Sequence, residues 1–128
     1  MILLDTCTLL WLVGDQERLS PRARDRLREH AGELFVSAIS AFEIGIKHRK
    51  GKLALPLEPG PWFEEAMDFH GLAEIPVSAR IAAHSTTLPA LHSDPCDRII
   101  VATAQLLGLT VLTPDALIRA YADCDVEW

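Results

Sequence analysis

The chain has 128 residues, which is the size of one domain, and we expect residues 1–128 to fold as a single unit. Hydrophobic residues make up 49% and charged residues 23% of it, a balance that excludes intrinsic disorder. No apolar run approaches the roughly 18 residues that span a bilayer, so no membrane partner is expected. The net charge of −6 excludes nucleic-acid binding through overall charge, and such a partner would need a local basic patch, a bound cation or both.

The start of the chain and its cysteines indicate a cellular compartment. Residues 1–5 lack the basic and long apolar regions of a signal peptide, so we expect a cytoplasmic protein. Cys7, Cys96 and Cys124 are an odd number without a C-x-x-C pair, which speaks against a disulfide framework and against a zinc ribbon. Small buried thiols are the expected state.

The first half of the chain alternates short apolar runs with helical segments. Ser20 precedes a proline at a first helical position, and Gly32 and Gly51 each end a helical pattern. In chain order we predict a strand at 2–4, a helix at 6–13, a helix from 21 ended by Gly32, a strand at 34–36 and a helix from 37 or 40 to 50.

The second half repeats this alternation. Gly71 and Gly108 end helical patterns, and Asp94 with the proline after it opens an almost wholly apolar helix. The predicted elements are a helix at 61–70, a strand near 73–77, a helix from the Ser78 cap to about 88, a helix at 95–107, a strand at 109–112, a helix opened by 113–114 and an edge strand at 126–128.

Strands that alternate with helices predict an α/β fold with a mainly parallel sheet. The helix at 95–107 is apolar nearly all round, as expected for a helix packed between a sheet and another layer. Ligands of such sheets collect beyond the carboxyl ends of the strands. That rule points to Asp5, just after the first strand, and to Asp115, just after the strand at 109–112.

Two further acids lie within apolar helical stripes. At helical spacing, Glu43 shares a face with apolar neighbours, and so does Asp97. Both carboxylates therefore occupy positions where core residues are expected. The two stripes are Ile39, Phe42, Glu43 and Ile46 in one helix, and Asp97, Ile100, Val101 and Ala104 in the other.

Four placed carboxylates favour a shared divalent cation, because a buried unpaired carboxylate costs several kcal/mol or becomes neutral. Mg²⁺ and Mn²⁺ prefer oxygen ligands of this kind. A structural alternative stays open for each acid. Glu43 completes a capping box with Ser40, Asp97 and Asp115 suit the first turn of a helix, and Asp5 can cap one.

The motifs together resemble the PIN-domain family, and within it the VapC-like ribonuclease toxins of bacterial toxin–antitoxin pairs. Their order and spacing match over essentially the whole chain, and only Cys96 differs, where the family often has a bulky apolar residue. The motifs are Ile-Leu-Leu-Asp5-Thr6, Ser37-x-x-Ser40-x-x-Glu43, His92-x-Asp94-Pro95-x-Asp97-Arg98 and Leu112-Thr113-x-Asp115.

The resemblance implies a three-layer α/β/α sandwich that acts as an endoribonuclease with Mg²⁺ or Mn²⁺. The implied acids are Asp5, Glu43, Asp97 and Asp115, with Glu43 as a ligand or as the base that orients water. It also implies RNA as the substrate, a homodimer, and an antitoxin protein that inserts a basic segment into the acidic pocket. Residues in possible supporting roles are Thr6, Asp94, Thr113 and Arg98, the last as a phosphate contact or as the partner of an acid.

Basic residues gather at the end of the Glu43 helix. They suit either a solvated helix end that complements the dipole or a phosphate-tracking ridge that leads to the acids. The histidines have no shared ligand spacing, so His92 is interpreted as a loop residue or a minor substrate contact. The basic cluster consists of Lys47, Arg49, Lys50 and Lys52.

Other functions remain as alternatives. A receiver-type signalling module would have paired acids after the first strand, where this chain has Asp5-Thr6-Cys7. A haloacid-type phosphatase would have a second aspartate in place of Cys7. A fold of the same family that only binds RNA or protein is a third alternative, and the intact acid set speaks against it.

Overall fold

The computed structural model describes residues 1–128 and contains a five-stranded sheet in the order β3-β2-β1-β4-β5. Every neighbouring pair of strands is parallel, so the carboxyl ends of all five strands lie along one edge. The predicted mainly parallel sheet is thereby confirmed. The strands are β1 (Ile2–Leu4), β2 (Leu34–Ser37), β3 (Leu72–Ile75), β4 (Thr110–Leu112) and β5 (Val126–Glu127).

The helices begin and end where local signals placed them, within a few residues. The hydroxyls of Ser20 and Ser78 accept backbone N–H groups at two helix starts, and Gly71 and Gly108 adopt left-handed conformations at two helix ends. No helix combines the length and hydropathy that crossing a bilayer requires. The helices are α1 (Thr6–Gly14), the 3₁₀ turn η1 (Gln16–Arg18), α2 (Pro21–Glu29), α3 (Ala38–Arg49), α4 (Pro59–His70), α5 (Ala79–Thr86), α6 (Pro95–Leu107) and α7 (Ala116–Arg119).

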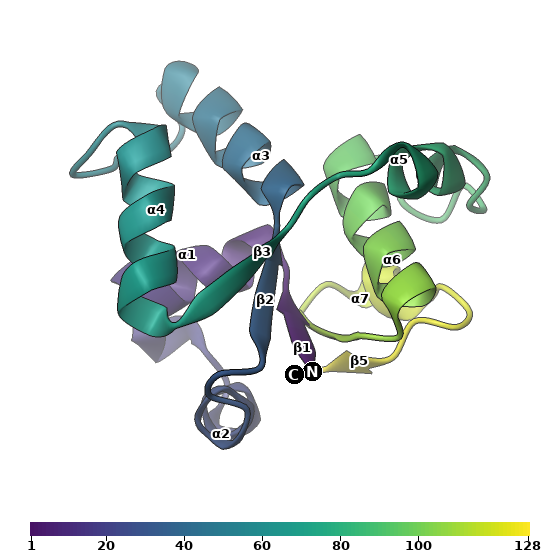
Figure 1. Ribbon diagram of the computed structural model, residues 1–128, viewed down its shortest axis with the longest axis horizontal. Helices are drawn as coiled ribbons and strands as arrows, with labels where there is room; N and C mark the ends of the chain where they lie inside the picture. Colours follow the sequence, from purple (N-terminus) through teal and green to yellow (C-terminus); the bar gives the residue numbers. More distant parts are fainter.

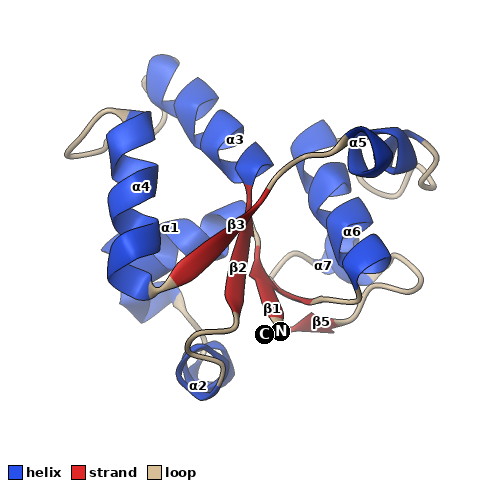
Figure 2. Cartoon of the chain, in the orientation of Figure 1, coloured by secondary structure: helices blue, strands red, loops and turns tan.

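Helices cover both faces of the sheet, which confirms the three-layer sandwich (Figures 1 and 2). Successive side chains of β1 point to opposite faces, so Ile2 and Leu4 pack with α1, α2 and α4, whereas Leu3 packs with α6 and α7. Helix α5 packs against α6. The two cores therefore meet at β1, in the middle of the sheet.

The predicted core face of α3 is wrong. The structure buries Ser40 and Ile44, while Phe42 keeps 59% of its surface exposed. The inward side of α3 carries Ile44, which joins the apolar core, and Ser40, whose hydroxyl lies 2.9 Å from the buried hydroxyl of Thr6 on α1. Glu43 lies beside this side, with its side chain 13% exposed.

The capping alternatives are resolved differently for each acid. Helix α3 begins after Ser37, whose hydroxyl accepts the N–H of Ile39, so Ser40 and Glu43 do not form a capping box. Asp5 is the N-cap of α1. Asp115 is the N-cap of α7, which starts later than predicted because the carboxylate accepts the N–H of residue 117.

Candidate active site

Asp5 directly follows the central strand β1, at the edge of the sheet where the strand order reverses. Chain connections run from β1 to β2 on one side, while β4 pairs with β1 on the other. Asp5 is 4% exposed, and its carboxylate accepts the N–H of Thr8 at 2.9 Å and the hydroxyl proton of Thr113. Burial raises the pKa of Asp5, although these hydrogen bonds favour the ionised form.

His92 links two carboxylates that come from different elements. Its Nε2 lies 3.1 Å from Oδ2 of Asp97 on α6 and 2.9 Å from Oδ2 of Asp115 after β4. Its Nδ1 accepts the backbone N–H of Asp94 at 3.1 Å. Since Nδ1 is an acceptor, the ring proton resides on Nε2, and His92 donates toward the two carboxylates.

Asp97 is the electrostatic centre of the site. Its side chain is 17% exposed. Burial, followed by the nearby charges of Asp94 and Glu43, raises its pKa to about 7, and the charge of Asp5 acts in the same direction. Asp97 is therefore protonated in a large fraction of molecules at neutral pH unless a cation offsets the surrounding charge.

Glu43 enters the site from α3 with one oxygen held and the other free. Its Oε2 forms an ion pair with Lys47 at 2.9 Å, while its Oε1 is buried and has no hydrogen-bond partner. Burial lowers the pKa of Lys47, but the Glu43 carboxylate and the neighbouring acids outweigh it, and the net shift is upward. Glu43 also lines a hollow of about 370 Å³ together with Asp94 and Cys96.

The donor set fits a hard divalent cation. The converging groups of Asp5, Glu43, Asp97 and Asp115 are carboxylates, the ligand type that Mg²⁺ and Mn²⁺ prefer. The raised pKa of Asp97 indicates an excess of negative charge around it, and the Oε1 of Glu43 has no hydrogen-bond donor. Ligand atoms of His92, Asp97 and Asp115 lie within 4.8 Å of one another, whereas Asp5 and Glu43 lie outside this group. The protonated Nε2 of His92 makes it a donor to the two acids and not a ligand.

Sequence reasoning undervalued His92. Its isolation in a loop left no ligand spacing to find, and its contacts with Asp97 and Asp115 depend on segments that meet only in the folded chain. One local signal was available, because the histidine stands two residues before Asp94 and five before Asp97. The Nδ1 contact with the N–H of Asp94 uses this short spacing.

The supporting residues lie at different distances from the acids. Thr113 touches Asp5 and also accepts the N–H of Asp115 at 3.0 Å, so it joins two site acids. The hydroxyl of Thr6 pairs with that of Ser40. Asp94 is the N-cap of α6, as its sequence position predicted, and it also contributes charge beside Asp97.

Arg98 does not face the acids, contrary to the interpretation of it as a phosphate contact or acid partner. Its guanidinium donates to four backbone carbonyls and to the Tyr121 hydroxyl, at 2.8 to 3.3 Å. These bonds hold the loop that carries His92 against α6. The four acceptor carbonyls belong to Ser85, Leu88, Pro89 and His92.

The cysteines are free thiols. Cys96 and Cys124 are buried, as predicted, and burial raises the pKa of each to about 11. Cys7 is half-buried beside the site, with Sγ 3.4 Å from Oδ1 of Asp5, and burial together with that carboxylate raises its pKa. All three therefore stay protonated at neutral pH, and Cys7 acts as a weak donor to Asp5.

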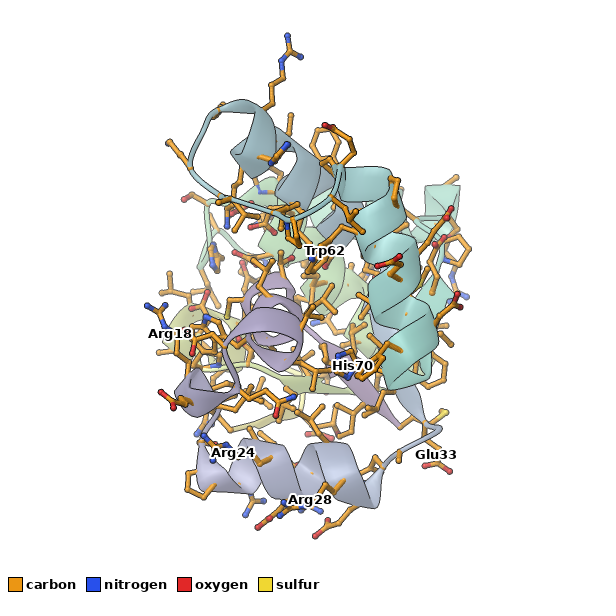
Figure 3. The ribbon with its side chains drawn as sticks, turned by 90° about the vertical axis from the view of Figure 1, so that its left-hand side faces the viewer. Arg18, Arg24, Arg28, Glu33, Trp62 and His70 are labelled. Atoms are coloured by element: carbon orange, nitrogen blue, oxygen red, sulfur yellow. The ribbon has the colours of Figure 1, made fainter.

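A second hollow, of about 330 Å³, lies between α1, α2 and α4, on the face shown in Figure 3. Four leucines and Ala31 form the apolar part of its lining, and Arg24, Arg28 and His70 contribute basic groups. None of its lining residues is a carboxylate, so it is separate from the acidic site.

Comparisons with known proteins agree with this geometry. The PIN-domain family profile matches residues 2–123. Ribonuclease VapC22 from Mycobacterium tuberculosis is 31% identical over 121 residues, which is 94% of this chain and 91% of the relative.

Solved structures share the fold. VapBC from Salmonella typhimurium, crystallised bound to DNA, superposes with a TM-score of 0.72 at 19% identity over 98% of this chain and 96% of that chain. A toxin–antitoxin complex from Klebsiella pneumoniae gives 0.67 at 23% identity over 100% and 97% of the respective chains. The chain therefore belongs to the PIN-domain family and is a relative of the VapC ribonucleases.

Proposed function

We propose that the protein is a metal-dependent endoribonuclease that hydrolyses RNA phosphodiester bonds at its carboxylate cluster. The observation that carries the proposal is the crowding of negative charge at Asp97, whose pKa is raised by burial and by the charges of Asp94, Glu43 and Asp5, and which shares His92 with Asp115. The relationship to a named ribonuclease supports RNA as the substrate. The intact set of acids speaks against the alternative of a non-catalytic signalling or binding module.

Mg²⁺ or Mn²⁺ would be held by Asp5, Asp97 and Asp115, with Glu43 as a further ligand or as the group that orients water. When bound, such an ion lowers the pKa of a bound water and stabilises charge on the phosphate. The protein prepares this site in advance: Thr113 fixes the Asp5 carboxylate, and His92 holds Asp97 and Asp115 next to each other.

Glu43 is oriented for a proton-accepting role. Lys47 holds Oε2, which leaves the buried Oε1 as an acceptor without a partner. A carboxylate that is fixed through one oxygen can align a water through the other once that oxygen becomes accessible. The N–H of Asp94 occupies Nδ1 of His92, which places the ring proton on Nε2, toward Asp97 and Asp115.

The same family relationship leads us to propose a cytoplasmic toxin that pairs with an antitoxin and forms a homodimer. The apolar hollow between α1, α2 and α4 provides a surface on which an antitoxin could pack, and the acids would attract a basic segment of it. Sedimentation of the purified chain tests the homodimer, and a monomer at micromolar concentration would contradict it.

The ribonuclease proposal is tested by incubating the chain with structured RNAs in Mg²⁺, in Mn²⁺ and in excess chelator. Asp5→Asn keeps the helix cap but removes a charge, and we expect it to reduce cleavage at least about a hundredfold. Asp68→Asn, an exposed acid on α4, is the matched control and should cleave normally. Cleavage that persists in chelator, or in Asp5→Asn, would refute the mechanism.

A further inference from the structure

Phe42 is a large aromatic side chain that the fold leaves in solvent. It is 59% exposed on α3, directly before Glu43. The side of α3 that faces inward carries Ser40, in contact with Thr6, and Ile44, which leaves Phe42 outside the core. An exposed aromatic next to a candidate catalytic acid requires a reason, because the apolar core does not use it.

The surroundings of Phe42 are cationic on one side and acidic on the other. Phe42 lines the hollow of about 370 Å³ that also contains Glu43 and Asp94, and Lys50 and Lys52 line the same hollow. Both lysines are exposed and have no ion-pair partner. Arg49, although it belongs to the same basic cluster in sequence, does not line the hollow.

We infer that Phe42 is a stacking platform for a nucleobase of single-stranded RNA, with Lys50 and Lys52 as contacts for the neighbouring phosphates. We place this base next to the phosphate that is cleaved, and this placement rests on the proposed ribonuclease function. Aromatic side chains beside cations bind single strands through base stacking and backbone charge. The bases of a duplex are already stacked on each other, so the platform selects unpaired nucleotides.

Charge favours RNA over a protein at this surface. Lysine is depleted at the core of protein interfaces, whereas it is the usual partner of phosphate. The two lysines also counteract the repulsion that the site acids exert on an RNA backbone. Other strongly exposed apolar side chains, such as Phe69 and Leu57, line a different hollow next to α4, so Phe42 is not part of that apolar surface.

The test measures the binding of a fluorescein-labelled 12-nucleotide single-stranded RNA in a Glu43→Gln background, with Mn²⁺ present. We expect Phe42→Ala to weaken binding about tenfold, Phe42→Trp to restore it and Phe42→Leu to leave it weak. A 12-base-pair RNA duplex should bind all four proteins equally. Equal binding of the single strand by Phe42→Ala, or full restoration by leucine, would overturn the inference.

The lysines are tested through salt dependence. Lys50→Gln and Lys52→Gln should each reduce the slope of log K against log salt by about the amount that one phosphate contact contributes. Arg49→Gln should leave this slope unchanged. An equal effect of Arg49→Gln would contradict the assignment of the phosphate contacts to Lys50 and Lys52. Sedimentation of Phe42→Ala serves as a further check, and a dimer that falls apart would show that the residue is a self-association contact instead.

The binding assay also separates this inference from the proposed function. If the unmutated protein never cleaves RNA but its RNA binding depends on Phe42, the ribonuclease proposal is refuted and the stacking platform is supported. If the unmutated chain cleaves RNA and Phe42→Ala has the same KM, the ribonuclease proposal is supported and the stacking platform is refuted.

Discussion

Replacing Asp97 with asparagine should stabilise the metal-free protein while it removes catalysis. Burial and the charges of Asp94 and Glu43 disfavour the ionised Asp97 carboxylate in the folded chain. Asparagine has nearly the same shape and no charge, and its carbonyl can still accept the Nε2 proton of His92. The substitution therefore removes the unfavourable charge without removing the contact.

The size of this stabilisation follows from the pKa. The pKa of this carboxyl is near 3.8 in the unfolded chain and about 7 in the folded one. The folded chain therefore favours the protonated form. The resulting contribution to the free energy of unfolding is complete below pH 4 and is lost as the pH rises through 7. Each unit of difference between these two pKa values corresponds to about 1.4 kcal/mol of unfolding free energy. Because Asp97 borders solvent, we reduce the total to about 1 to 2 kcal/mol at pH 8. For a domain of this length, that raises Tm by about 3 to 8 °C.

Thermal unfolding of metal-free protein at pH 8 and at pH 4.5 measures the effect. Asp97→Asn should unfold at a higher temperature than the unmutated chain at pH 8, with the difference shrinking to a small fraction at pH 4.5. Asp68→Asn controls for the change in net charge. Added Mn²⁺ should stabilise the unmutated chain and Asp68→Asn, but not Asp97→Asn. An equal Tm at pH 8, or a difference that does not depend on pH, would refute the electrostatic reasoning.

Three other measurements test the site. Glu43→Gln should lower the cleavage rate at least about a hundredfold without changing Tm by more than a few degrees, and retained cleavage would remove Glu43 from the mechanism. Calorimetry should find Mn²⁺ binding roughly tenfold weaker at pH 6 than at pH 8, because the proton on Asp97 must leave, and affinity independent of pH would contradict this. Arg98→Ala should cost about 2 to 4 kcal/mol in urea unfolding, since its guanidinium bonds to four carbonyls, whereas the exposed Arg80→Ala should cost less than about 0.5 kcal/mol.

Local chemistry made much of the fold predictable. Helix starts such as Ser20 with Pro21, and helix ends such as Gly71 and Gly108, act within a few residues and do not depend on the rest of the chain. The parallel sheet followed from the alternation of strands and helices. Because parallel strands end at one edge, the positions of Asp5 and Asp115 were also predictable from sequence.

What could not be predicted depends on contacts between distant segments. The helical period of α3 indicated a core face that contains Phe42, but the folded helix buries Ile44 and the Ser40 that contacts Thr6, and no local pattern encodes that contact. Arg98 stands next to Asp97 in sequence, yet it bonds to loop carbonyls because successive helical residues point about 100° apart. His92 gained its partners only through folding.

The central claim is that the carboxylates around Asp97 hold the ion that RNA cleavage requires. Crystals soaked in Mn²⁺ and measured at a wavelength with manganese anomalous signal test it most directly. We expect an anomalous peak bonded to carboxylate oxygens of Asp5 and Asp97, which Asp97→Asn abolishes. A protein that cleaves RNA under the same conditions, with no peak among these carboxylates, would contradict it.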